Sequence, residues 1–208
     1  MKTFFVTGIG TNVGKTIASA IITEALQADY WKPIQSGTID GSDKHMVSEL
    51  ISNEKTKVHD EIYAFREPAS PHLAASLENQ TIQLSKLVLP ESSNHLVIEG
   101  AGGILVPINS NNFVIDIANS FNCDVILVIR NYLGCINHSL LSIDYLVSNN
   151  YNLKGLVLIG NFDKLVKSAI LNHAEIPVIL EINELEAINK EVISEFSKNV
   201  NVSVLLED

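Results

Sequence analysis

The sequence has few basic residues and no long apolar run, and both shortages exclude classes of protein. Of its 208 residues, 14 are Lys or Arg and 24 are Asp or Glu, so the net charge is −10. This balance argues against a nucleic-acid partner or an anionic membrane surface, although a few local cations can still hold a small anion. No apolar stretch approaches the roughly 18 residues needed to span a bilayer.

Cysteine is scarce too, and the two present, Cys123 and Cys135, do not form a CxxC pair. This spacing favours two reduced thiols. The apolar run that ends before Gly8 is too short for a signal peptide and no cleavage site follows it, so we interpret it as a buried strand and expect a cytoplasmic protein. The six histidines show no zinc-ligand spacing. Surface or capping roles are favoured for all of them, including His72 and His138 near the expected cleft.

The sequence does contain a regular alternation of apolar strands and helical segments. Strands are expected at residues 2–7, 30–34, 95–98, 124–129, 154–159 and 178–180, with a loop at 100–112. Helices are expected at residues 16–28, 43–51, 70–79, 114–121, 137–147, 163–173 and 185–196. Strands that are apolar on both faces and alternate with helices predict a mainly parallel central sheet flanked by helices. We therefore expect a single three-layer α/β domain of the P-loop NTPase-like type, residues 1–208, with ligands at the carboxyl ends of its strands.

Residues 8–16, Gly-Ile-Gly-Thr-Asn-Val-Gly-Lys-Thr, lie between the first strand and the first helix. Glycines let backbone N–H groups converge on one anion, and the helix that follows adds its N-terminal dipole. Lys15 would reach the β- and γ-phosphates, and Thr16 would place its hydroxyl on Mg²⁺. The spacing is G-x5-GKT instead of the common G-x4-GK-[ST], and Gly10 stands where related regulatory ATPases carry a second lysine. The alternative is an incidental turn that binds nothing.

Three charged residues are further candidates for a functional site, and two of them, Lys32 and Glu99, fall in segments at the expected carboxyl edge of the sheet. Glu99 ends an apolar strand, where a carboxylate reaches Mg²⁺ directly or through water, unless it is merely a solvated acid. Asp43 precedes a helical run and is either a metal ligand or an N-cap, and spacing alone favours the cap. Lys32 lies in a short strand before Pro33, a position that favours an amine facing a cleft.

Five blocks in order resemble one family, the dethiobiotin synthetases of biotin biosynthesis. They are residues 5–16, 32–37, 67–72, 99–103 and 133–138. The first and fourth blocks occur in relatives of other function, whereas the second, third and fifth together are more specific. The resemblance covers nearly the whole chain and accounts for the G-x5-GKT spacing.

The resemblance implies a reaction with ATP and CO₂ as co-substrates and Mg²⁺ as cofactor. One amine of 7,8-diaminopelargonic acid takes up CO₂, and the resulting carbamate attacks the γ-phosphate to give a carbamic-phosphoric anhydride. The second amine then closes the ureido ring of dethiobiotin, releasing ADP and phosphate. Because carbamate and γ-phosphate are both anions, cations must lie between them.

The resemblance also implies the roles of particular residues. Catalysis would rest on Lys32, Lys15 and Thr11, and Mg²⁺ would be held by Thr16, Asp43 and Glu99. The substrate would be bound by Ser36, Ser70 and Pro71, and its carboxylate would be held across a homodimer interface by Gly134, Cys135, Ile136 and Asn137. ATP would be bound by Asn12, Val13, Gly14, Lys15, Thr16, Ile17, Asp43, Glu99, Gly100, Ala101 and Gly102, with the adenine near Asn161, Pro177 and Glu181.

Two departures from the family pattern and two alternatives remain. Asn12 stands where many members carry Glu, and the stretch between Gly37 and Asp43 is short. A dimeric ATP-driven switch that positions partner proteins would share the fold, because fold alone does not define function. An amidotransferase module would need a glutaminase domain, for which 208 residues leave no room.

Overall fold

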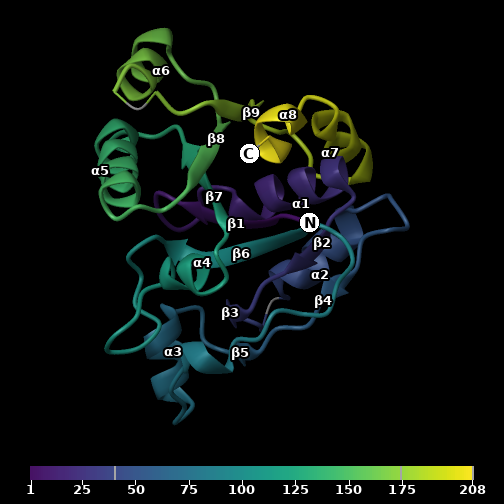
Figure 1. Cartoon of the computed structure of the whole chain (residues 1–208), viewed down its shortest axis with the longest axis vertical. Helices are drawn as coiled ribbons and strands as arrows, with labels where there is room; N and C mark the ends of the chain where they lie inside the picture. Colours follow the sequence, from purple (N-terminus) through teal and green to yellow (C-terminus); the bar gives the residue numbers. More distant parts are fainter. Residues whose placement is uncertain (40, 174, 208) are drawn as a thin grey trace.

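The protein is built around a parallel sheet, seen in a computed structural model that describes residues 1–39, 41–173 and 175–207 (Figure 1). The seven-stranded sheet has the order β4-β2-β6-β1-β7-β8-β9, and every neighbouring pair is parallel. Its strands are β1 (Thr3–Gly8), β2 (Asp29–Trp31), β4 (Val58–His59), β6 (Leu96–Gly103), β7 (Asp124–Arg130), β8 (Leu153–Ile159) and β9 (Val178–Ile182). A second, two-stranded sheet pairs β3 (Ile34–Ser36) with β5 (Tyr63–Phe65).

Helices cover both faces of the main sheet. They are α1 (Lys15–Leu26), α2 (Asp43–Leu50), α3 (Pro71–Leu77), α4 (Asp116–Ser120), α5 (Cys135–Ser148), α6 (Lys164–Leu171), α7 (Lys190–Ser197) and α8 (Val202–Leu206), with a 3-10 turn η1 (Leu84–Lys86). In Figure 1, α5 and α6 lie on the opposite side of the sheet from α1 and α7. The predicted three-layer α/β architecture is confirmed.

The strands alternate their side chains between two buried clusters, as parallel strands covered on both faces must. Phe4 and Val6 of β1 pack on the side of α1, with Ile21 and Ile22. Phe5 of β1 points to the other side, together with buried residues of α4, α5 and α6. None of the helices in the described ranges combines the length and apolar character that a membrane crossing requires. Cys123 and Cys135 are both free and buried.

The predicted strand at residues 30–34 is wrong as a single element. The chain leaves the main sheet after Trp31 and enters the small sheet at Ile34. Pro33 has no N–H to donate to a ladder, which explains the break, and its carbonyl accepts from the N–H groups of Ile62 and Tyr63. Lys32 therefore stands at the crossing between two sheets.

Three further predictions need correction. The loop expected at residues 100–112 begins only after Gly103, because β6 continues through the glycines and pairs Gly103 with Gly8. The helix expected at residues 185–196 begins at Lys190, because Asn189 caps it by accepting from the Val192 N–H. The helix expected from residue 137 starts two residues earlier, at Cys135.

Candidate functional site

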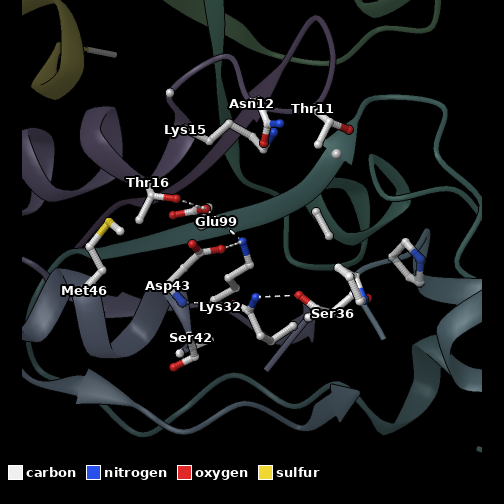
Figure 2. Close-up of a pocket in the computed structure, with 18 of the residues that line it drawn as sticks. Thr11, Asn12, Lys15, Thr16, Lys32, Ser36, Ser42, Asp43, Met46 and Glu99 are labelled. Atoms are coloured by element: carbon white, nitrogen blue, oxygen red, sulfur yellow. Dashed lines mark hydrogen bonds and ion pairs between the residues drawn. The ribbon is translucent and has the colours of Figure 1, made fainter. Parts of the chain in front are cut away.

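A cleft of about 870 Å³ opens at the carboxyl ends of β1, β3 and β6 (Figure 2). Its lining includes residues of the glycine loop and the first turn of α1, of the segment from Lys32 through β3, of the start of α2, of the turn before α3, and of β6. Of the predicted site residues, the lining includes Thr11, Asn12, Gly14, Lys15, Thr16, Ile17, Lys32, Ser36, Asp43, Ser70, Pro71, Glu99, Ala101 and Gly102. The structure thus gathers most of the predicted residues around one cavity.

The glycine loop joins β1 to α1 in a conformation that its sequence makes possible. Gly14 precedes the helix with φ +93°, in the left-handed region that glycine adopts without strain. A Cβ at Gly14 would lie 2.6 Å from Ile159 Cδ1, so a larger residue would also clash. Val13, predicted to contact ATP, packs its side chain into the core and does not line the cleft. The first-turn N–H groups of α1 point into the loop without intrahelical acceptors, as an anion site requires.

The Lys15 side chain contacts the backbone of this loop. Its ammonium donates to the Gly10 carbonyl at 2.9 Å, across the space that the loop encloses. Burial lowers the pKa of Lys15 to about 8, against the opposing attraction of the Glu99 carboxylate. The loop therefore holds its positive charge at a desolvation cost, and a bound triphosphate would supply the counter-charge.

Glu99 is the centre of the polar network below the loop. Its side chain is 1% exposed, and its Oε1 accepts from Thr16 Oγ1 at 3.0 Å and from Lys32 Nζ at 2.8 Å. The Tyr30 hydroxyl donates to the other oxygen, Oε2, at 2.8 Å. Burial and the nearby Glu99 charge raise the pKa of Tyr30 well above its ordinary value, so the hydroxyl keeps its proton. The alternative of a solvated acid at position 99 is wrong.

Lys32 bridges two carboxylates, as Figure 2 shows. Its Nζ contacts Asp43 Oδ2 as well as Glu99 Oε1, and the residue is 5% exposed. Burial by itself lowers the pKa of Lys32, but the charges of Glu99 and Asp43 outweigh it and raise the pKa above its ordinary value. Lys32 is thus a charged amine facing the cleft, as its position in the sequence predicted.

The capping interpretation of Asp43 is wrong, because Ser42 caps α2. The Ser42 hydroxyl accepts from the His45 N–H at 3.2 Å, while Asp43 is the first helical residue and turns its carboxylate to Lys32. Sequence reasoning missed Gln35, whose Oε1 accepts from the Asp43 N–H at 3.2 Å. Its Nε2 donates to the Ser36 carbonyl, so Gln35 ties the start of α2 to β3.

The oxygens of Thr16, Glu99 and Asp43 fit a divalent cation held partly by a nucleotide. Thr16 and Lys32 both contact Glu99 Oε1, and Lys32 also contacts Asp43, so all three oxygen donors surround one small region. Within the described ranges no group of three or more His, Cys, Asp and Glu side chains could hold a metal by itself. Where Mg²⁺ is bound together with a phosphate ligand, it usually takes one or two carboxylates from the protein and completes its coordination shell with phosphate and water.

The far end of the cleft presents the predicted substrate contacts. Ser36 Oγ is buried and has no hydrogen-bond partner among the described residues, which leaves it available to a ligand. Ser70 occupies the N-cap position of α3 but its side chain makes no capping bond, and Pro71 is the first helical residue. Thr11 faces the same space from the glycine loop.

The predicted carboxylate-binding segment lies outside this cleft. Gly134 precedes α5 with φ +107°, and Cys135, Ile136 and Asn137 form the first turn of that helix. None of these four residues lines the cleft of the same chain. His138 hydrogen-bonds through its ring to the Tyr132 hydroxyl at 2.7 Å.

The predicted adenine contacts are also outside the cleft. Asn161 follows β8 at the carboxyl edge of the sheet, where its carbonyl accepts from Asn131 Nδ2 at 2.6 Å. Glu181 forms an exposed ion pair with Lys167. Pro177 precedes β9 and so lies at the opposite edge of the sheet from the glycine loop, and the structure does not bring it to the nucleotide loop. Gly100 is packed beneath Phe5 and does not line the cleft.

The fold has three layers, with a parallel sheet between two layers of helices. A glycine loop joins β1 to α1, which begins with Lys15 and Thr16. Together these features define a P-loop NTPase. Solved structures show the same fold. A plasmid partition protein of Borrelia burgdorferi, bound to AMPPNP, aligns with TM-score 0.56 at 14% identity, covering 99% of this chain and 98% of that one. A ParA family ATPase of Chlorobium tepidum aligns with TM-score 0.53 at 11% identity, covering 100% and 98%.

Sequence comparisons narrow the class to one family. Residues 2–192 match a family profile described as "AAA domain". The ATP-dependent dethiobiotin synthetase BioD of Christiangramia forsetii is 41% identical over 197 residues, with 95% of each chain covered. That of Cytophaga hutchinsonii is 42% identical over 198 residues, with 95% of this chain and 96% of the relative covered. The chain belongs to the ATP-dependent dethiobiotin synthetase family and is an ATP-dependent ligase.

Proposed function

We propose that the protein carboxylates 7,8-diaminopelargonic acid with CO₂ and ATP and closes the ureido ring of dethiobiotin. The observation that carries this proposal is the position of Lys32. It lies in one cleft between the phosphate loop and the hydroxyls of Ser36 and Ser70, where a second anion would face the γ-phosphate. We place the reaction in the cytoplasm, since both cysteines are free thiols.

The proposed chemistry has three steps: an addition to CO₂, a phosphoryl transfer and a ring closure. One amine of the substrate attacks CO₂ and loses a proton, giving a carbamate. A carbamate oxygen then attacks the γ-phosphorus, the bond to the β-phosphate oxygen breaks, and ADP leaves. The second amine attacks the carbonyl carbon of the anhydride, loses a proton and expels phosphate. Ring closure needs mainly positioning, because the second amine is already tethered to the carbonyl.

The cations of the cleft would lower the repulsion between carbamate and triphosphate. Lys15 would contact the phosphates from the loop, and Lys32 would sit between the γ-phosphate and the carbamate. Ser36 and Ser70 would accept from or donate to the amines and the carbamate. Thr11 would contact the reacting groups from the loop.

Magnesium fits the oxygen donors of this site. Thr16, Asp43 and Glu99 would hold it, and it would neutralise charge on the β- and γ-phosphates. For that to happen Lys32 must give up part of its contact with Asp43 and Glu99.

The substrate carboxylate would be bound by the start of α5 from a second copy of the chain. Backbone N–H groups of Ile136 and Asn137 belong to the first helical turn, which favours an anion. Two leucines near this turn are exposed, Leu133 fully and Leu141 of α5 by 62%. Pairing two copies through this surface would bury both leucines and bring the turn to the partner's cleft.

Replacing Leu141 by glutamate is expected to separate the proposed dimer and to reduce turnover. A charge on an apolar interface must be desolvated, which disfavours association. Sedimentation velocity would give the mass, and Leu77→Glu on α3 is the matched control because Leu77 is 59% exposed on a different helix. A Leu141→Glu protein with the mass and turnover of the wild type would contradict the α5 interface.

The direct test of the reaction is the product. The protein is incubated with Mg-ATP, bicarbonate and 7,8-diaminopelargonic acid, and we expect dethiobiotin by mass together with one phosphate per product. Omitting the diamine should stop phosphate release. ATP turnover that is indifferent to the diamine would reject the ligase reaction and favour a dimeric ATP-driven switch, whose fold this chain shares.

A further inference from the structure

Tyr30 hydrogen-bonds to Glu99 without lining the cleft, and no step of the proposed reaction uses it. The residue is fully buried in β2, and its hydroxyl donates to Glu99 Oε2 at 2.8 Å. Among the residues that the structure describes, no other side chain or backbone group donates to this oxygen. The other oxygen, Oε1, accepts from Thr16 and Lys32. The two oxygens of Glu99 thus have separate partners on separate sides.

The geometry of the sheet explains how a tyrosine reaches Glu99. In the pairing of β2 with β6, Tyr30 lies beside Val97, two residues before Glu99. Side chains two apart on a strand point to the same face, so Glu99 is the diagonal neighbour of Tyr30, within reach of a long aromatic side chain. Tyr30 and Val97 belong to the same buried cluster, on the side of α1, which also carries Thr16.

The separate partners of the two oxygens affect how firmly the Glu99 carboxylate is oriented. The terminal torsion of a glutamate side chain has a broad, roughly two-fold energy profile, so packing alone fixes a carboxylate poorly. A hydrogen bond to one oxygen removes that freedom and aims the other. A buried carboxylate oxygen that loses its hydrogen-bond donor is destabilised, which favours a new hydrogen bond to another donor. For Glu99 the nearest donors are Thr16 and Lys32, the two side chains that the proposed chemistry needs.

We propose that Tyr30 is a positioning residue: its hydroxyl fixes Glu99 through Oε2, so that Oε1 stays aimed at Thr16, Lys32 and the proposed cation. This inference rests on the proposed function in one respect, since it assigns Glu99 to the nucleotide site. Tyr30 itself contacts neither nucleotide nor substrate, because it is fully buried and does not line the cleft. Its effect must therefore pass through the Glu99 carboxylate.

Tyr30→Phe removes only the hydroxyl and keeps the ring in its packing. We expect about a tenfold rise in the Mg²⁺ concentration that half-saturates binding of a fluorescent ATP analogue, as for one lost hydrogen bond to a charged group. The same variant should show a lower kcat with little change in KM for the diamine. The matched control is Tyr63→Phe, another buried tyrosine, whose hydroxyl accepts from the Gln83 N–H at 3.1 Å away from the cleft.

Melting temperatures separate positioning from a general loss of stability. Each variant loses one tyrosine hydrogen bond, so both should melt at a slightly lower temperature, but only Tyr30→Phe should change the Mg²⁺ dependence. Equal Mg²⁺ dependence and kcat in Tyr30→Phe and wild type would overturn the inference, and so would equal effects in the two variants. The binding assay contains no diamine. A wild type that makes no dethiobiotin would therefore refute the proposed reaction, and the role of Tyr30 would still be decided by the binding shift.

Discussion

Lys15→Ala is expected to lower kcat/KM for dethiobiotin formation by about a thousandfold, a loss of about 4 kcal/mol at 1.36 kcal/mol per tenfold change. The physical reason is the position of the ammonium, which donates to the Gly10 carbonyl inside the loop where the phosphates would sit. Alanine keeps the helix but removes the charge. Part of the loss should appear as weaker binding of a non-hydrolysable ATP analogue, measured by calorimetry.

The control for this variant is Lys190→Ala. Lys190 is the exposed first residue of α7, and its removal takes away the same charge at a place without a nucleotide. We expect wild-type turnover and binding for it. A Lys15→Ala protein that retains more than a tenth of wild-type kcat/KM would show that the loop is not the phosphate site.

Lys32→Met is expected to lower kcat at least a hundredfold while nucleotide binding changes much less. Methionine keeps the length and packing of the stem but removes the charge between the γ-phosphate and the proposed carbamate. The diagnostic result is the difference between this variant and Lys15→Ala in nucleotide binding. Lys15 would act in binding ATP, whereas Lys32 would act mainly in the reaction. Steady-state turnover and calorimetric binding of the ATP analogue measure the two effects separately.

The matched control is Lys44→Met on the same helix as Asp43. Lys44 also bridges two carboxylates, Asp60 at 3.0 Å and Glu61 at 2.8 Å, but outside the cleft. Removing one partner of a buried ion pair costs about 3–5 kcal/mol, so Lys32→Met should also melt at a lower temperature, and turnover is measured well below that temperature. Equal losses of binding and turnover would mean that Lys32 only holds ATP, and wild-type turnover would remove it from the mechanism.

The elements that the sequence predicts best are those with strong local signals. The apolar runs of β1, β7 and β8 and the residues Gly14, Lys15 and Thr16 between β1 and α1 carry such signals, and the structure contains all of them. Lys32 and Glu99 were expected together because both fall at the carboxyl ends of strands, where ligands collect. Asp43 was added to them only by the family resemblance, and the contacts of Lys32 with both carboxylates bring the three side chains together.

The parts that could not be predicted depend on long-range contacts. Tyr30 and Glu99 are 69 positions apart, and only the neighbouring positions of β2 and β6 bring them together. The glycines after Glu99 resemble a loop because they lack β-propensity, yet the partner strand β1 supplies their pairing. The start of α7 was the avoidable error, since Asn189 is a recognisable N-cap.

The connection between β2 and β3 restricts the insertions and deletions that this enzyme can tolerate. Two residues, Lys32 and Pro33, connect strands that belong to different sheets, so the segment from Asp29 to Ser36 has no slack. A one-residue insertion there would reverse the direction of each following side chain and turn the lysine away from the cleft. The length of this segment is therefore fixed. Insertions and fusions would be better tolerated in a surface connection such as residues 88–93.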